Sequence, residues 1–494
     1  MTVRPHTTSR RRFLAGTASA AALGATLSAC APATPAGPVA GFTHGVASGD
    51  PHPDSVVLWT RLDPTGHSGS AAVSWEIATD DSFSAVVANG TATTGGHRDW
   101  TVNLVAGGLA AATSYAYRFV DEAGNTSPVG RTRTAPSGSA ARLRFAVASC
   151  SNYAFGNFHA YGHMADRTDL DAWLHLGDYI YEYANPGAGE TYGEYRLLDP
   201  VTEIRSLSDY RLRYAHYRAD PDLQELHRRH PMIHVWDDHE FADDPFIGGA
   251  GNHQPEDGDW NLRVADALQA YTEWMPTRLD GNRIFRTLRY GDLATIVAVD
   301  RQRRYLWPEP DDGDLYLGRE QFDWLDGQLG GVTSSWSVLA QQTTFGATGT
   351  NRRSGGWGER DRGRVLSSLA PTGSDLVVLT GDIHRFHAID VLDDPDAYDR
   401  STGAGVGAVE FAAGSISSPG GNGSGTGPQV RWTSGDQRGY LLVDLTPERV
   451  QADFYGFPDP EKLLVRRPPE RWLGGFSSHR GAPGLRQASS PAPG

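Results

Sequence analysis

The sequence of 494 residues contains only two cysteines, Cys30 and Cys150, and all but one of its 44 basic residues are arginines. Two cysteines allow one intrachain disulfide at most, and none if Cys30 is modified during export. Basic residues are outnumbered by 59 acidic ones, which gives a net charge of −15. This charge argues against a stable nucleic-acid partner and against attachment to anionic lipid by charge alone, because both need a basic surface. It does not exclude a phosphate-bearing substrate, since bound cations can reverse the local potential.

The N-terminal region lacks an apolar run long enough for a convincing membrane-spanning helix. The run from Ala15 to Ala29 is short and rich in Ala, Gly and Ser. It follows a twin-arginine pattern, Ser9-Arg10-Arg11-Arg12-Phe13-Leu14, and ends at Leu27-Ser28-Ala29-Cys30, which resembles a lipoprotein processing box. Residues 1–30 are therefore predicted to direct export by the twin-arginine route, to the cell envelope or the outside. Cys30 would become a lipid anchor, and residues 31–40 form a tether.

The length exceeds what one core usually supports, so at least two domains are expected. From 41 to 135, short runs rich in β-branched and aromatic residues alternate with Gly, Asp and Asn, which predicts a small all-β sandwich of the immunoglobulin or fibronectin kind. From 143 to 475, buried strand-like runs alternate with helical stretches, which predicts a layered α/β domain. The Gly-, Ser- and Pro-rich segment 476–494 is predicted to be a disordered tail. The strand-like runs of the α/β domain are 143–148, 172–176, 232–236, 294–299, 337–340 and 376–380.

Polar residues that can bind metals follow several of these runs directly. Ligands of open α/β sheets bind beyond the carboxyl ends of the strands. One Asp after a strand is usually a helix cap, but four such ends together are hard to interpret as four separate caps. Buried carboxylates would repel one another unless cations neutralised them, so the pattern predicts a multinuclear metal site. The four strand ends carry Ser149-Cys150, Gly177-Asp178-Tyr179-Ile180-Tyr181, Asp237-Asp238-His239-Glu240 and Gly381-Asp382-Ile383-His384.

The order of these motifs resembles that of the metallophosphoesterases, whose fold is an αββα sandwich. Their surroundings are similar to the PhoD-like alkaline phosphatases over about residues 41 to 457. The stretches that carry this closer resemblance include Gly45-Val46-Ala47-Ser48-Gly49-Asp50-Pro51, Val57-Leu58-Trp59-Thr60-Arg61, His175-Leu176-Gly177-Asp178-Tyr179, Trp236-Asp237-Asp238-His239-Glu240, Gly251-Asn252-His253-Gln254 and Gly414-Ser415-Ile416-Ser417-Ser418. The resemblance implies an exported, metal-dependent phosphoesterase that hydrolyses phosphate monoesters, diesters or both.

The resemblance also implies the ligands. Cys150, Asp178, Tyr181 and His384 match the ligands of a ferric ion, and Asp178 would bridge to a second metal. A phenolate and a thiolate suit a redox-capable transition metal, whereas carboxylates suit a hard cation such as Ca²⁺. Other divalent cations remain open. Asp382 would also lie near the cluster, and Asp238 would face the second cation or the substrate. Asp244 stands where the family commonly has an asparagine, and it would add a carboxylate if its side chain meets a calcium.

Two further residues are predicted to take part in catalysis beside Asp238. His239 matches the histidine to which the family gives a proton-donor or oxyanion-stabilising role. Arg301 follows the predicted strand 294–299 and is a candidate phosphate clamp, because a guanidinium pairs with phosphate through two hydrogen bonds. The alternative for Arg301 is a surface salt bridge.

Three other interpretations are open at this stage. The same cluster would serve a phospholipase D-like phosphodiesterase, whose substrate is a lipid. A lipid-anchored binding protein would need no transition metal. A Cys150 nucleophile lacks a base placed beside it in the sequence, and acidic neighbours would raise the pKa of its thiol.

Overall fold

The computed structural model describes residues 40–185, 196–310, 313–348, 357–420, 425, 427–457 and 466–494. The predicted export signal with Cys30, and the predicted tether except for residue 40, lie outside these ranges. Among the helices that are described, none combines the length and the apolar character needed to cross a bilayer.

Three sheets make up the β-structure of the described residues. The ten strands of the first sheet lie in the order β21-β20-β19-β18-β8-β9-β10-β1-β2-β5, the seven of the second in the order β11-β12-β13-β14-β16-β15-β17, and the four of the third in the order β4-β3-β6-β7. In the first sheet the bounds are β1 (Val46–Gly49), β2 (Ser55–Arg61), β5 (Thr101–Gly107), β8 (Leu143–Ala148), β9 (Ala172–Leu176), β10 (Met232–Val235), β18 (Gly439–Leu445), β19 (Arg449–Gly456), β20 (Arg471–His479) and β21 (Ala482–Gln487). In the second they are β11 (Arg286–Tyr290), β12 (Ala294–Ala298), β13 (Trp336–Gln341), β14 (Asp375–Thr380), β15 (Phe386–Leu392), β16 (Val406–Ala412) and β17 (Val430–Ser434). In the third they are β3 (Ser70–Ala78), β4 (Val86–Gly95), β6 (Ser114–Asp121) and β7 (Gly130–Arg133).

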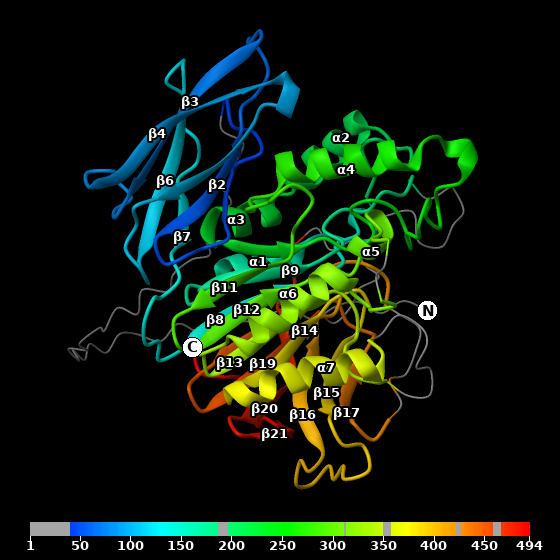
Figure 1. The fold of residues 1–494 in the computed structure, drawn as a ribbon. Helices are drawn as coiled ribbons and strands as arrows, with labels where there is room; N and C mark the ends of the chain where they lie inside the picture. The colour runs from blue at the N-terminus through cyan, green and yellow to red at the C-terminus, as the bar shows by residue number, and fades with distance from the viewer. Residues whose placement is uncertain are drawn as a thin grey trace, which may run out of the picture. The chain divides into compact units, whose positions relative to one another are not determined.

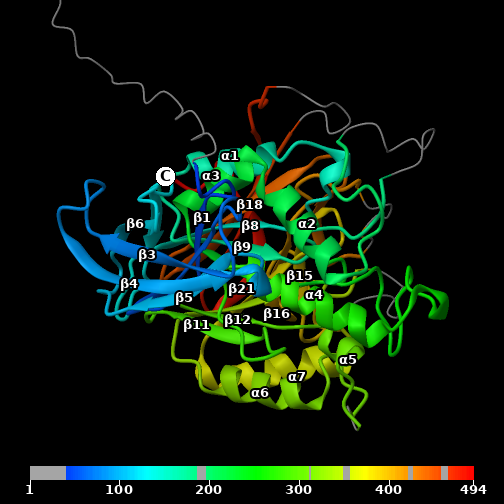
Figure 2. The same ribbon diagram turned by 90° about the horizontal axis from the view of Figure 1, so that it is seen from above.

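The helices lie on the outer faces of the first two sheets, as Figures 1 and 2 show for α6 and α7 beside the second sheet. The α-helices are α1 (His159–Asp166), α2 (Leu207–Arg218), α3 (Pro221–Arg229), α4 (Trp260–Trp274), α5 (Arg303–Leu306), α6 (Arg319–Gly330) and α7 (Glu359–Leu369). Sequence signals fix their starts: Ser206 and Asp209 form a capping box at α2, and Asp220 caps α3, which opens with Pro221.

Three apolar cores fill the spaces between these layers of helices and sheets. Leu174 of β9 and Val338 of β13 pack into the core between the two large sheets. Their neighbours point the opposite way, because successive side chains of a strand alternate between its faces. Trp173 therefore packs into the core of the first helical layer, and Leu339 packs against α6 and α7. Both faces of each central strand are covered, which explains their continuous apolar runs. The predicted αββα sandwich is confirmed.

The N-terminal β-region is a sandwich, but it does not have two sheets of its own. Strands β1, β2 and β5 belong to the first large sheet, which β1 joins by pairing in parallel with β10. One face of these strands, which carries Val56 and Leu58 of β2, packs on the third sheet. The core between them also includes Val73 of β3 and Phe119 of β6. The pattern of residues 41–135 indicates short half-buried strands, but it carries no signal for pairing with a strand near residue 232.

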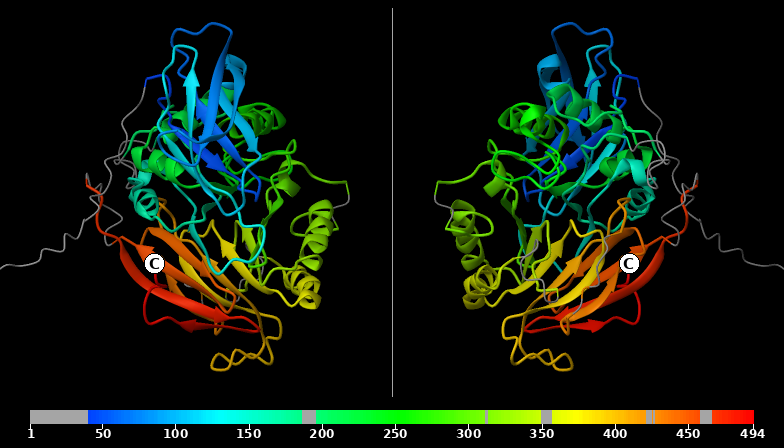
Figure 3. Two further views of the ribbon diagram at one scale, coloured as in Figure 1. Left: turned by 90° about the vertical axis from the view of Figure 1, so that its left-hand side faces the viewer. Right: turned by 90° about the vertical axis from the view of Figure 1, so that its right-hand side faces the viewer.

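The C-terminal segment differs from the disordered tail expected for 476–494. Strands β20 and β21 pair with each other, and β20 pairs with β19. In both views of Figure 3 the red C-terminal strands continue the row of orange strands. Phe476 and Leu485 are 5% and 1% exposed and join the core between the large sheets. Small and turn-forming residues dominate this composition, but one apolar side chain on each of the two strands is buried in the core, and composition alone does not show this.

The joint between β1 and β10 leads to a prediction about stability. A Cβ on Gly49 would lie 1.9 Å from the carbonyl oxygen of Pro276 and 3.0 Å from that of Met232. Backbone atoms yield little, so Gly49→Ala is expected to lower the free energy of unfolding by about 1–3 kcal/mol in chemical denaturation. The matched control is Gly107→Ala in β5, where a Cβ meets only the Cβ of Ser55 at 4.0 Å and unfolding should be nearly unchanged. Equal stability of the two variants would contradict the close approach of the Pro276 and Met232 carbonyl groups to Gly49.

Candidate metal centre

The predicted site residues come from the carboxyl ends of strands in both large sheets. Strands β8, β9 and β10 run parallel to one another, as do β12, β13, β14 and β16. The two sets of ends meet where Ser149, after β8, forms a bridge with Ser415, after β16. A Cβ on Gly381, after β14, would lie 2.5 Å from the carbonyl oxygen of Leu176 in β9. The two sheets thus place their strand-end loops in contact.

The loops reach the site in an unusual backbone conformation. Cys150, Asp178, Asp382 and His384 all have left-handed φ values, between 50° and 62°. Each such residue other than glycine costs about 1–3 kcal/mol, and this kind of strain is typical of functional sites. Gly177 also has a positive φ, of 98°, and a Cβ there would lie 2.4 Å from the Cβ of Asp237. Glycine at 177 lets the ends of β9 and β10 approach.

Three groups of side chains among the described residues could each hold a metal ion. Within each group, one ligand atom of every member lies within 4.8 Å of those of the others. The groups overlap, because Asp178 belongs to two of them and Asp238 to two. They consist of Cys150, Asp178 and His384; of Asp178, Asp238 and His239; and of Asp237, Asp238 and Asp382. We call these seven residues the cluster.

Tyr181 lies against the first group, as predicted. Its hydroxyl donates to Oδ2 of Asp178 at 3.2 Å and lies 3.1 Å from Nε2 of His384. Ser418, from the loop after β16, donates to the Tyr181 oxygen at 2.8 Å. The four residues expected to bind a ferric ion are therefore brought together.

The electrostatics of the cluster fit a bound cation. Oδ1 of Asp178 and Oδ2 of Asp237 are buried without a hydrogen-bond partner. Burial, and then the neighbouring carboxylates, raise the pKa of Asp178 well above its usual value, although His239 opposes this. Burial and the charge of Asp178 also raise the pKa of the Cys150 thiol. Arg301 and His239 offset only part of the negative charge of these groups, and a cation in contact with the unpaired oxygens of Asp178 and Asp237 would offset more of it.

Arg301 lies beside the cluster and is only 13% exposed, so it is not a surface salt bridge. Its Nε donates to Oδ1 of Asp237 at 2.8 Å, and its two terminal nitrogens lie 3.9 Å from Asp238 and 3.7 Å from Asp382. The guanidinium thus spans three carboxylates of the cluster. This position is compatible with the predicted contact to a phosphate.

Asp244 does not join the cluster through its carboxylate. Its side chain is exposed and belongs to none of the three groups, and its backbone N–H donates to Oδ2 of Asp238 at 3.0 Å. Asp244 has a left-handed φ of 46°, and its contact with Asp238 is made by the backbone amide. Among the described residues, the predicted carboxylate ligand at this position is therefore not supported by the structure.

Three acidic residues that the sequence analysis did not assign shape the site. Asp237 is fully buried and belongs to the third group, and its signal was its place beside Asp238 at the end of β10. Glu240 accepts hydrogen bonds from the backbone N–H groups of Asp178, Tyr179 and Asp237 and so ties two loops together. Glu182 lies 2.8 Å from Nδ1 of His239. The last two make long-range contacts, which no local pattern predicts.

Comparisons with known proteins agree with this geometry. Residues 145–454 match the family described as PhoD-like phosphatase, and residues 29–136 match the PhoD-like phosphatase N-terminal domain. The chain is 34% identical over 501 residues to alkaline phosphatase D of Bacillus subtilis (strain 168), a match that covers 91% of this chain and 82% of that protein. A solved structure described as the structure of PhoD is 32% identical, with a TM-score of 0.79, over 93% of this chain and 94% of the other.

These matches extend over most of the chain and include the strand ends that carry the cluster. The chain therefore belongs to the PhoD-like phosphatase family and is a hydrolase of phosphoric ester bonds.

Proposed function

We propose that this phosphatase depends on metal ions held by the residues of the cluster other than His239, and that it hydrolyses small phosphate monoesters, diesters or both. The observation that carries the proposal is the overlap of the three groups at Asp178 and Asp238. Because two carboxylates are shared between groups, the cluster could hold more than one cation, and such cations would supply the metal-ion chemistry of ester hydrolysis.

The donors divide by chemistry. Cys150, Tyr181 and His384 offer sulfur, phenol and imidazole around Asp178, a set that suits a ferric ion. Asp237, Asp238 and Asp382 offer only oxygen, which suits Ca²⁺ or another hard divalent cation. When bound, such cations neutralise ester oxygens and activate water for attack on phosphorus.

The protein's own groups would then orient the ester and handle the proton. His239 is 8% exposed and its Nδ1 is held by Glu182, which leaves Nε2 to donate a proton to the departing alkoxide oxygen. Arg301 would hold a phosphate oxygen of the substrate while its Nε stays on Asp237. Glu182 and Glu240 do not need to touch the substrate, because they position His239 and the two loops.

Replacement of Asp178, which belongs to two of the three groups, tests whether hydrolysis depends on bound metal. Asp178→Asn keeps the shape of the side chain but loses its charge, so it should reduce the bound iron measured by elemental analysis. Hydrolysis of both a monoester and a diester should fall at least about a hundredfold, since metal ions stabilise the transition state by several kcal/mol. The matched control is Asp244→Asn, which alters the exposed carboxylate of a residue whose backbone contacts Asp238 and should retain both metal and activity. Full activity of Asp178→Asn would refute the proposal.

The role of His239 is tested with esters that differ in their leaving groups. An alkoxide needs a proton as it departs, whereas nitrophenolate does not. In His239→Asn, kcat should fall about 10²–10⁴-fold for alkyl phosphates and much less for nitrophenyl phosphate, with unchanged metal content. Equal losses for both esters would argue against proton donation, and loss of metal would make His239 a ligand.

We also propose that the protein is exported by the twin-arginine route and lipid-anchored at Cys30. The support is the order of the two signals in residues 9–30. In a bacterium with this route, replacing Arg10 and Arg11 by Lys should leave the precursor in the cytoplasm. Cys30→Ala should still be exported but should lose acyl labelling. Export of the double lysine variant at the normal level would contradict the route.

A further inference from the structure

A cavity of about 850 Å³ lies away from the cluster, and none of the residues that line it belongs to the cluster. One wall comes from β6, β7 and the loop between β3 and β4. The other walls come from β8, from the loop between α1 and β9, and from the end of α3. The cavity therefore lies where the third sheet meets the α/β part of the chain.

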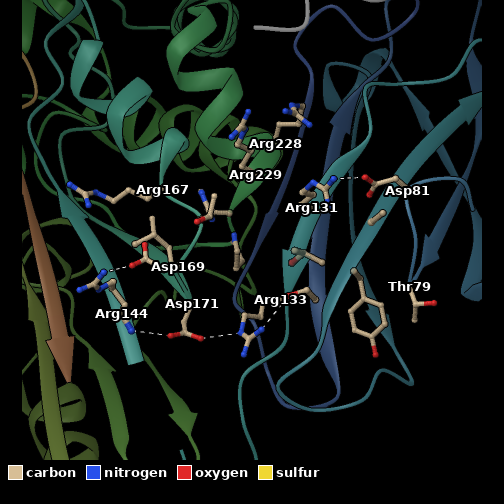
Figure 4. Close-up of a pocket in the computed structure, with 18 of the residues that line it drawn as sticks. Thr79, Asp81, Arg131, Arg133, Arg144, Arg167, Asp169, Asp171, Arg228 and Arg229 are labelled. Carbon is tan, nitrogen blue, oxygen red and sulfur yellow. Dashed lines mark hydrogen bonds and ion pairs between the residues drawn. The ribbon is translucent and has the colours of Figure 1, made fainter. Parts of the chain in front are cut away.

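The lining is strongly basic in a protein with a net charge of −15. Seven arginines line the cavity, against three aspartates. In Figure 4 the labelled arginines approach from separate elements, with Arg131 and Arg133 on β7, Arg228 and Arg229 on α3, and Arg144 on β8. Their guanidinium groups therefore offer several separate contacts to one ligand.

The carboxylates around the cavity do not balance these charges one for one. Arg228 and Arg229 share a single partner, because both donate to Oε1 of Glu225, at 2.6 and 2.5 Å. The other five arginines of the lining each pair with a different carboxylate: Arg131 with Asp81, Arg133 with Asp171, Arg142 with Asp444, Arg144 with Asp169 and Arg167 with Glu470. The seven arginines of the lining thus pair with six carboxylates, and the one positive charge left for an anion lies at the α3 pair.

A buried histidine completes the lining next to the α3 pair. His230 is 7% exposed, lines the cavity, and has an Nε2 with no hydrogen-bond partner. A buried polar atom left without a partner costs about 1–3 kcal/mol, and a ligand that filled the cavity could relieve this cost. Structural salt bridges alone leave this nitrogen unexplained.

We propose that this cavity binds a small molecule carrying two or more phosphate groups. Guanidinium groups pair with phosphate through two hydrogen bonds in a fixed geometry, which ammonium groups cannot do. The volume greatly exceeds that of one phosphate, and the arginines stand on separate walls, so a ligand with more than one anionic group matches them best. Such a ligand would link the third sheet to the α/β part and raise the melting temperature.

The experiment measures binding of fructose 1,6-bisphosphate, with inorganic phosphate as the single-anion probe, by calorimetry and thermal unfolding. Asp178→Asn serves as the background, since it removes the anion site of the cluster and should prevent hydrolysis of the probe. One molecule of bisphosphate is expected to bind this variant and to raise its melting temperature. Inorganic phosphate should bind more weakly. Hydrolysis by Asp178→Asn would refute the proposed function and not the cavity, whose binding is then read from the arginine variants.

Two substitutions in this background test the walls separately. Arg228→Gln and Arg131→Gln should each weaken bisphosphate binding about tenfold or more, because each removes a charged hydrogen-bond donor. The side chain of Arg131 is 55% exposed, so its replacement should not disturb folding even if that of Arg228 does. The matched control is Arg364→Gln, which removes a paired arginine outside the cavity. Absence of binding, or equal binding by Arg131→Gln and the control, would overturn the proposal.

Discussion

The site is built around buried carboxylates that repel one another when they are ionised together. Two unit charges 4 Å apart repel by about 4 kcal/mol at an effective dielectric constant of about 20. The cluster gathers Asp178, Asp237 and Asp238 at 5% exposure or less, with Asp382 beside them. Arg301 and His239 offset only part of this charge. The fold brings these residues together through left-handed strand ends, so the strain and the repulsion occur at the same place.

The residues around the cluster hold its members in position through hydrogen bonds. Glu240 holds the loops after β9 and β10 through three backbone N–H groups and so fixes the spacing of Asp178 and Asp237. Gln302 donates to Oδ1 of Asp237 at 2.6 Å, beside the contact from Arg301. Such outer contacts orient ligands and typically change metal affinity or activity 10–100-fold when lost. A centre of this kind is therefore built from more residues than those that would touch a metal.

The sequence predicts the strands and their ends well, because both signals are local. A run such as 172–176 is apolar throughout, since its strand is covered on both faces, and the polar residues after it stand out. Pairing over long distances has no such signal, which is why the joining of β1 to β10 was not predicted. Asp244 shows a related limit. Its residue type suggests a ligand, but the contact with Asp238 is made by its backbone amide, which the residue type does not predict.

Both the cluster and the cavity described above contain arginine as a cationic side chain. Lys462 is the only lysine of the chain, so nearly every cationic side chain is a planar guanidinium that stays charged at any physiological pH. At the cluster this geometry lets Arg301 span Asp237, Asp238 and Asp382 at once. On α3 it lets Arg228 and Arg229 share Glu225 while their remaining N–H donors stay available to other acceptors. An acidic protein can thus keep regions of opposite charge on one chain, because carboxylates outnumber their cationic neighbours at the cluster, whereas the seven arginines of the cavity outnumber the six carboxylates that pair with them.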